Sequence, residues 1–139
     1  MAVVTTIFKV SRHAHLGHAA RRMGAEGLQA LDFLFAEGEF AFRSGQPLPT
    51  VVMLDLNLPR IGGLEVLERL RADERTRLLP VVILTSTDEQ RDRVASYRNG
   101  ANSFVRKPLD FGEFAETVAR LGVYWLATNE PPEEGEGGR

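Results

Sequence analysis

The chain has 139 residues, of which 43% are hydrophobic and 26% charged, so it can bury the core of one folded domain and is not a disordered segment. It contains no cysteine, which excludes disulfides, thiolate metal sites and cysteine nucleophiles. The formal charge is −2 at pH 7, and no apolar run reaches the roughly 20 residues of a membrane-spanning helix. We therefore expect a cytoplasmic domain that binds neither nucleic acid nor membranes.

The first 26 residues predict one strand followed by a basic segment. Residues 2–10 (AVVTTIFKV) are β-branched and apolar, which is typical of a buried strand. The following segment is rich in arginine and contains His13, His15 and His18, but no acidic residue precedes Glu26. The histidines suggest a transition-metal site only weakly, because on a helix only two of them would share a face. A solvated basic segment is the better interpretation.

The middle of the chain alternates between helical and strand patterns. Leucine and phenylalanine recur at helical spacing over residues 28–35, and a loop closed by two prolines follows over residues 39–49. Residues 50–54 (TVVML) form a continuous apolar run, typical of a strand buried on both faces. The pattern over residues 61–72 then predicts an amphipathic helix.

The last third of the chain continues this alternation. Residues 80–84 (PVVIL) predict a second buried strand, and a capping-box pattern at 86–89 predicts a helix that stops at Gly100. Residues 103–106 predict a short strand. Asp110 is the expected cap of a last helix, with an apolar stripe at Phe111, Phe114, Val118, Leu121 and Trp125. We expect Phe111, Phe114 and Val118 of this stripe to lie in the core.

Strands that alternate with helices predict the fold class directly. They form βαβ units, hence an α/β domain with a doubly wound parallel sheet covered on both faces. We assign residues 1–128 to this single domain. Residues 129–139 (NEPPEEGEGGR) are acidic and have few apolar residues, so we expect a disordered tail.

Three polar residues follow the predicted strands. Asp55, Thr85 and Lys107 each stand at the carboxyl end of a strand, where ligands bind in doubly wound sheets. A carboxylate, a hydroxyl and an ammonium at one edge can hold a phosphoryl group, with Asp55 as nucleophile and the other two meeting the phosphoryl oxygens. Singly, each residue is more often a cap, an ion-pair partner or a solvated side chain, but the set is improbable by chance.

Three stretches of the chain together resemble the response-regulator receiver domain of two-component signalling: VVMLDLNLPRIGGLEVLERLR, LLPVVILTSTDEQRD and GANSFVRKPLDFGEF. The resemblance implies a flavodoxin-like fold and the acceptance of a phosphoryl group from a histidine kinase in a phosphorelay. It makes Asp55 the phosphoacceptor, with Thr85 and Lys107 as phosphoryl contacts. It also makes Thr85 and Phe104 a switch pair. Asn57 stands where a hydrolase with an aspartyl nucleophile would have a second aspartate, so we do not expect an enzyme.

The resemblance also implies a bound Mg²⁺ and a cis proline. Asp55 and the backbone carbonyl of Asn57 match two of the metal ligands, and Pro108 matches the cis proline after the lysine. The remaining metal ligands of the family, an acidic pair after the first strand, are absent here. This absence motivates an alternative: a degenerate pseudo-receiver that acts as a binding and dimerisation module independently of phosphorylation.

Residues 1–26 are atypical for such a domain. Only residues 11–26 are available for the first helix and second strand. We therefore expect that the first helix is curtailed, that the second strand is missing, or that residues 1–23 do not match the family. The stretch before Asp55 and the ending LGVYWLATNEPPE resemble stand-alone receivers that partner phytochrome-type histidine kinases. We expect no DNA-binding output domain after Trp125, and therefore output through protein contacts or onward phosphotransfer. We also expect a homodimer formed through Val118, Leu121, Tyr124 and Trp125.

Overall fold

The computed structural model describes residues 7–10, 20–22, 27–45, 48–57, 61–86 and 89–132, the first two ranges by their backbone. Its elements, in chain order, are β1 (Ile7–Val10), β2 (Ala20–Arg22), α1 (Gly27–Phe35), the 3-10 helix η2 (Gly38–Arg43), β3 (Val51–Leu54), α2 (Gly63–Ala72), β4 (Val81–Thr85), α3 (Gln90–Arg98), β5 (Ser103–Arg106), α4 (Phe111–Val123) and the π-helical turn η3 (Tyr124–Thr128). No helix among these residues is long and apolar enough to cross a membrane.

The sheet has five strands in the order β2-β1-β3-β4-β5. β3, β4 and β5 are parallel, as the βαβ pattern predicts. β1 instead runs antiparallel to both of its neighbours, with Ile7 opposite Leu54 and Val10 opposite Val51. The short connection over residues 11–19 explains the antiparallel β1–β2 pair, because a parallel pair needs a crossover of roughly a dozen residues or more.

The expected curtailment near the amino terminus falls partly outside the described residues. A second strand is present, but β2 has only three residues. A helix between β1 and β2 could lie only in residues 11–19, which are outside the described part of the chain, as are His13, His15 and His18.

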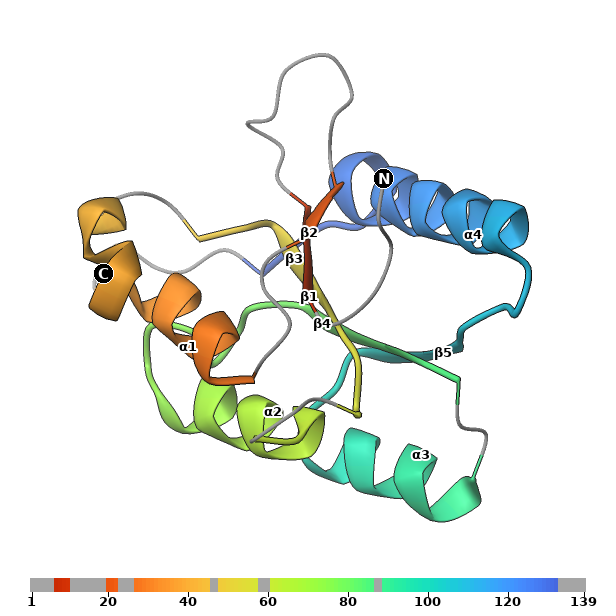
Figure 1. Ribbon diagram of the computed structural model, residues 1–139, viewed down its shortest axis with the longest axis horizontal. Coiled ribbons are helices and arrows are strands. Elements are labelled where there is room, and N and C mark those ends of the chain that lie inside the picture. Colours follow the sequence, from red (N-terminus) through yellow and green to blue (C-terminus); the bar gives the residue numbers. More distant parts are fainter. Residues whose placement is uncertain are drawn as a thin grey trace.

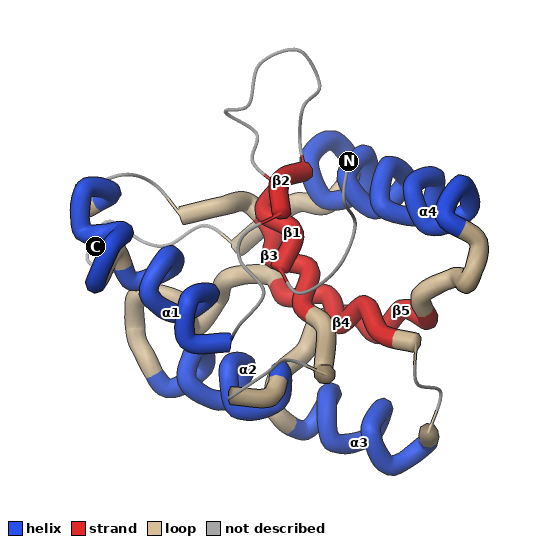
Figure 2. Tube along the Cα trace, viewed as in Figure 1, coloured by secondary structure: helices blue, strands red, loops and turns tan. Residues whose placement is uncertain are grey.

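Helices cover both faces of the sheet, with α1 and α2 on one side and α4 on the other (Figures 1 and 2). Successive strand residues point to opposite faces, so β3 and β4 contribute to two cores. The core on the α1–α2 side contains Val52, Leu54, Val81 and Ile83. The core on the α4 side contains Val51, Met53, Val82, Leu84, Phe114, Val118 and Trp125. A core on each face of the sheet is what the predicted doubly wound α/β fold requires.

The ends of α3 and α4 can be compared with the capping residues predicted from the sequence. Asp110 caps α4 as predicted, because its carboxylate accepts a hydrogen bond of 2.9 Å from the N–H of Glu113. The capping box at 86–89 was a wrong prediction: α3 begins at Gln90, and its N-cap Glu89 makes no side-chain cap bond. The predicted stop at Gly100 is confirmed, with the positive φ of +96° that favours glycine there.

One prediction about the C-terminal region needs correction. Phe111 is 58% exposed, whereas Phe114 and Val118 are buried as expected. Phe111 is the first residue of α4, so it lies beyond the end of the stripe that the sheet covers. Of residues 129–139, which we assigned to the tail, 129–132 are described: the N–H of Asn129 donates to the carbonyl of Tyr124 at 2.6 Å, and residues 130–132 are exposed. Residues 133–139 lie outside the described part.

Candidate functional site

The predicted site residues meet at one edge of the sheet. Asp55 directly follows β3, Thr85 is the last residue of β4, and Lys107 directly follows β5. Because these three strands are parallel and adjacent, their carboxyl ends lie together. Residues separated by 52 positions in sequence are thereby brought into contact.

Asp55 and Lys107 form an ion pair. The ammonium Nζ of Lys107 lies 2.8 Å from Oδ2 of Asp55, and the side chains are 24% and 12% exposed respectively. The backbone N–H of Asn57 donates to Oδ1 of Asp55 at 2.9 Å. Both carboxylate oxygens therefore accept a hydrogen bond, which keeps the carboxylate oriented while part of it stays accessible.

Thr85 carries a hydroxyl without a partner. The side chain is fully buried, and its Oγ1 makes no hydrogen bond within the described part of the chain. Its carbonyl accepts a hydrogen bond of 2.7 Å from the N–H of Lys107, which joins the two residues across the ends of β4 and β5. A buried hydroxyl left unpaired costs about 1–3 kcal/mol, a cost that a ligand oxygen accepting its proton would remove.

Gly63 is a site residue that our sequence analysis missed. A Cβ there would lie 2.2 Å from the carbonyl oxygen of Asp55 and 2.7 Å from Cα of Leu56. Its N–H donates to the carbonyl of Leu56 at 3.0 Å, so the start of α2 packs directly on the backbone of the acceptor. The adjacent glycines in the stretch IGGLEV are the signal that could have indicated this close approach.

Phe104 lies on the face of the sheet that Thr85 also faces. Phe104 pairs in register with Ile83, two residues before Thr85, and packs against the core that contains Ile83. The guanidinium carbon of Arg93 lies 5.6 Å from the centre of its ring. The predicted switch pair therefore shares one face of the sheet, with α3 beyond it.

The peptide bond before Pro108 is trans, and the described residues contain no cis peptide bond. The cis proline implied by the resemblance is therefore wrong for this structure. A trans bond is the ordinary state before proline, where it is favoured by about 0.5–1 kcal/mol.

The described residues do not fit a magnesium site. Mg²⁺ requires several oxygen ligands in near-octahedral geometry, and among these residues no group of three His, Asp or Glu side chains could hold a metal ion. The direction of β1 adds a second reason. Val10, its last residue, lies opposite Val51 at the start of β3, so the chain leaves β1 at the edge opposite Asp55. Residues 11–25, where the family would have its acidic metal ligands, therefore contain no acid and follow β1 at the edge opposite Asp55.

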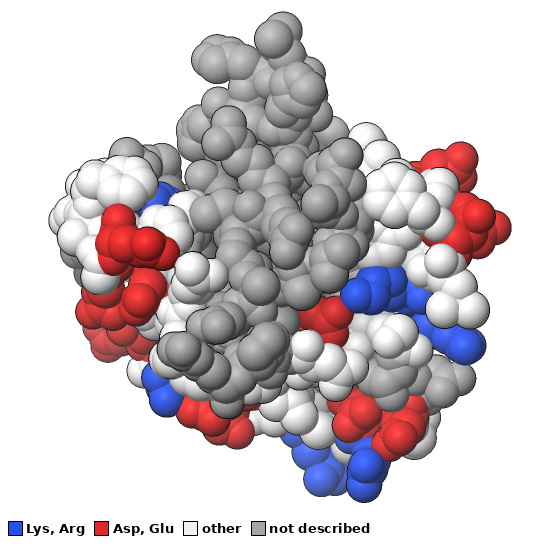
Figure 3. Space-filling model, viewed as in Figure 1, with Lys and Arg blue, Asp and Glu red and all other residues white. Residues whose placement is uncertain are grey.

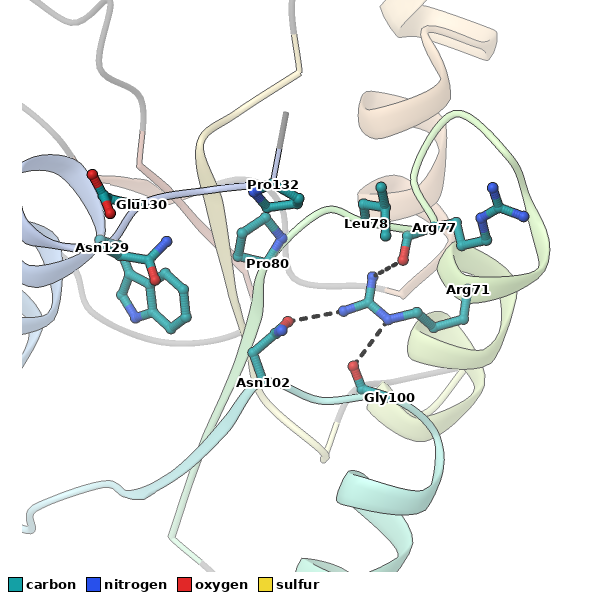
Figure 4. A pocket seen from close by; sticks show the side chains of 10 residues that line it. Arg71, Arg77, Leu78, Pro80, Gly100, Asn102, Asn129, Glu130 and Pro132 are labelled. Atoms are coloured by element: carbon teal, nitrogen blue, oxygen red, sulfur yellow. Dashed lines mark hydrogen bonds between the residues drawn. The ribbon is translucent and has the colours of Figure 1, made fainter. Parts of the chain in front are cut away.

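A second polar cluster lies at the amino edge of β4 and β5 (Figure 4). Arg71 is its centre: Nε donates to the carbonyl of Gly100 at 2.9 Å, Nη1 to that of Leu79 at 2.8 Å, and Nη2 to Oδ1 of Asn102 at 3.0 Å. Burial lowers the pKa of this guanidinium. A cavity of about 410 Å³ borders the cluster, and Trp125 and Asn129 line its other side. This cavity lies away from the predicted site residues.

The predicted interface residues divide between core and surface. Val118 and Trp125 are buried in the core on the α4 side, and Leu121 packs partly against it. The interface prediction was therefore wrong for Val118 and Trp125, because this part of their stripe faces the sheet, whereas the core position also expected for Val118 is confirmed. Tyr124 is 48% exposed, and its ring meets that of Trp125 edge to face.

The response regulator receiver domain family matches residues 13–119, which is most of the chain. This chain belongs to the response regulator receiver domain family. The match begins at His13, so part of the atypical amino-terminal segment is also similar to the family. Membership confirms the resemblance carried by the sequence around Asp55, Thr85 and Lys107.

Similar proteins include regulators of several kinds. The probable methanogenesis regulatory protein FilR2 of Methanothrix harundinacea is 41% identical over 108 residues, which span 77% of this chain and 66% of FilR2. The Mn²⁺-bound form of response regulator Rcp1, from Synechocystis, is 32% identical with a TM-score of 0.68, covering 78% of this chain and 76% of that one.

A phosphorylated relative has also been solved. The phosphorylated cyanobacterial phytochrome response regulator RcpA is 30% identical with a TM-score of 0.72, covering 79% of this chain and 76% of that one. These likenesses confirm the receiver fold of the domain. The chain spans about two thirds of the length of FilR2, so what the longer relative does as a whole is not carried over.

Proposed function

We propose that this chain is a receiver that accepts a phosphoryl group on Asp55 from a histidine kinase and signals through protein contacts. The observation that carries the proposal is the Asp55–Lys107 pair at 2.8 Å beside the buried, unpartnered hydroxyl of Thr85. An oxyanion bound at Asp55 would give both Lys107 and Thr85 an acceptor for their protons. The chain acts as a phosphoacceptor in this proposal and not as an enzyme.

The proposed transfer requires one bond to form and one to break. A carboxylate oxygen of Asp55 attacks the phosphorus of a phosphohistidine, and the P–N bond breaks as the P–O bond forms. The electron pair of the P–N bond leaves with the imidazole, which takes a proton from solvent. Lys107 turns from the carboxylate to a phosphoryl oxygen and neutralises part of the transferred charge.

Phosphoryl uptake from a small donor tests this proposal. Phosphoramidate supplies the same P–N bond without a kinase, and intact-protein mass measures the product. We expect the wild type to gain one phosphoryl group and Asp55→Asn to gain none. Asp73→Asn, a change in the turn after α2 at the opposite edge, is the matched control and should behave like the wild type. A wild type that stays unmodified at saturating donor would contradict the proposal.

The misfit between this site and a metal ion supports a second candidate, the pseudo-receiver. In that case Asp55 and Lys107 would be a structural ion pair, and the domain would act as a binding module. Partner binding and self-association should then be unchanged by Asp55→Asn and by Mg²⁺. A clear dependence on either one would exclude this candidate.

The proposed partners follow from the relatives and the surface. RcpA is a phytochrome response regulator, which supports a phytochrome-type kinase as the phosphodonor of this chain. The formal charge of −2 supports a protein partner over a nucleic acid. Among the described residues on the face seen in Figure 3, basic groups lie among acidic ones. Such an exchange with a kinase would take place in the cytoplasm.

Homodimer formation is a further part of the proposal. Val123 and Tyr124 are 63% and 48% exposed at the end of α4, an apolar pair without cover in the described part of the chain. A second copy could bury them. Sedimentation analysis of Val123→Asp should show a smaller dimer fraction than the wild type, and an unchanged fraction would exclude this surface.

A further inference from the structure

A line of side chains connects the acceptor edge of the sheet to helix α3. Thr85 and Ile83 alternate with Leu84 along β4, so both face the α1–α2 side of the sheet. Phe104 of β5 is the register partner of Ile83 and packs on the same side. On β5 the side chains of this face are those of Phe104, beside Ile83, and of Arg106, the register partner of Thr85.

Arg93 of α3 holds the other side of this ring. Its guanidinium carbon lies 5.6 Å from the ring centre, within the range of a cation–π interaction. Its Nη1 also donates to Oε1 of Gln90 at 3.3 Å, which restricts the guanidinium to this side of the helix. The contact therefore joins α3 to the edge strand β5 through the Phe104 ring.

We propose that Arg93 is a positioning residue that holds Phe104 in the arrangement of the unphosphorylated domain. This proposal rests on the proposed function, because it concerns the change that follows phosphoryl transfer to Asp55. Thr85 must move or turn to give its hydroxyl to a phosphoryl oxygen, and the Phe104 ring, which lies beside Ile83 on the same face, then has room to move. A ring that moves toward Thr85 leaves Arg93, so the contact opposes the change.

The strength of the contact sets the size of the effect. A cation–π contact with a partly exposed guanidinium shifts a two-state equilibrium by about two- to five-fold. Loss of the contact should raise the fraction of molecules in the phosphorylation-competent arrangement by that factor. The rate of phosphoryl uptake rises in proportion, because uptake depends on the fraction of competent molecules.

Rates of uptake from phosphoramidate, followed by intact mass in the full chain, test the role of Arg93. We expect Arg93→Met to be phosphorylated about two- to five-fold faster than the wild type, and Arg93→Lys, which keeps the cation, to lie between them. Arg91→Met is the matched control, because Arg91 is on the same helix but bonds Glu89 at 2.8 Å, and its rate should equal the wild type. In a Phe104→Leu background, Arg93→Met should no longer change the rate.

The outcomes separate this proposal from the proposed function. A phosphorylated wild type with an unchanged rate in Arg93→Met would overturn the role of Arg93 alone. An Arg93→Met effect that persists in the Phe104→Leu background would also overturn it, because the contact would not be the cause. A wild type that accepts no phosphoryl group would contradict the proposed function and this role together.

Discussion

Polar groups at the two edges of the parallel strands differ in whether their hydrogen bonds are made within the domain. At the amino edge, the guanidinium of Arg71 donates to several carbonyls and to Asn102, so its hydrogen bonds are made within the domain. At the carboxyl edge, the Thr85 hydroxyl has no partner among the described residues. A polar cluster whose bonds are complete stabilises the fold, whereas an incomplete one indicates a place for a ligand.

The largest expected change in the free energy of unfolding is at the amino edge of the parallel strands. Arg71→Met should leave the carbonyls of Gly100 and Leu79 without their donors and lower the free energy of unfolding by about 3 kcal/mol. Urea denaturation measures this. Arg77→Met is the control, since the Arg77 side chain is exposed and should change stability by less than about 0.5 kcal/mol. Equal stability of both variants would show that the hydrogen bonds of Arg71 do not stabilise the segments that contain Gly100 and Leu79.

A change of opposite sign in the free energy of unfolding is expected at the carboxyl edge of the parallel strands. Thr85→Val replaces the unpartnered hydroxyl by a methyl group of similar size, so the free energy of unfolding should rise by about 1 kcal/mol. Phosphoryl uptake at Asp55 should fall at the same time. Urea denaturation and intact mass measure the two effects. A Thr85→Val variant that loses stability would mean that the hydroxyl has a structural partner, and the contrast between the edges would fail.

A third variant changes stability without touching either edge. Gly122 lies inside α4, and a Cβ built there meets no atom within 4 Å. Gly122→Ala should therefore stabilise the domain by about 0.5–1 kcal/mol, because alanine loses less backbone entropy in a helix. Phosphoryl uptake should be unchanged, which separates a gain in stability from the loss of function expected for Thr85→Val. A destabilised Gly122→Ala would show that other atoms occupy the space that the added Cβ needs.

The smallest effect concerns the turn after α2. Hydrogen bonds from the side chain and backbone of Arg75 hold the pKa of Asp73 below its ordinary value. A carboxyl with a depressed folded pKa adds stability above its unfolded pKa, and this is lost as the pH falls through the folded pKa. In Arg75→Met the pKa of Asp73 should rise, measured by NMR titration. The stability difference between variant and wild type should then shrink in acid to the part that comes from losing the Arg75–Phe35 contact, in which the guanidinium carbon lies 4.6 Å from the ring centre. A difference as large in acid as at neutral pH would contradict this cause.

The sequence predicted the parallel part of the fold and the meeting of the site residues. Continuous apolar runs at β3 and β4 and the polar residues after them were sufficient, because parallel neighbouring strands bring their carboxyl ends to one edge. The Asp55–Lys107 contact followed from this topology without any knowledge of side-chain positions. The chemical roles of Asp55, Thr85 and Lys107 remain predictions until phosphorylation is measured.

Features that depend on packing between distant segments could not be read from the sequence. The direction of β1 is set by its pairing with β3 and by a short connection, and an apolar strand pattern does not encode direction. The burial of Trp125 depends on where the π-helical end of α4 turns toward the sheet. The close approach of Gly63 to the Asp55 carbonyl depends on how α2 docks, which periodicity does not report.

The position of Trp125 determines what intrinsic fluorescence can report. It is the single tryptophan of the chain, it is 8% exposed, and it borders the cavity beside Asn129. Its emission therefore monitors the packing of the C-terminal segment and the unfolding of the domain. Spectral changes during titration with a phosphodonor would indicate that events at one edge of the sheet reach the other.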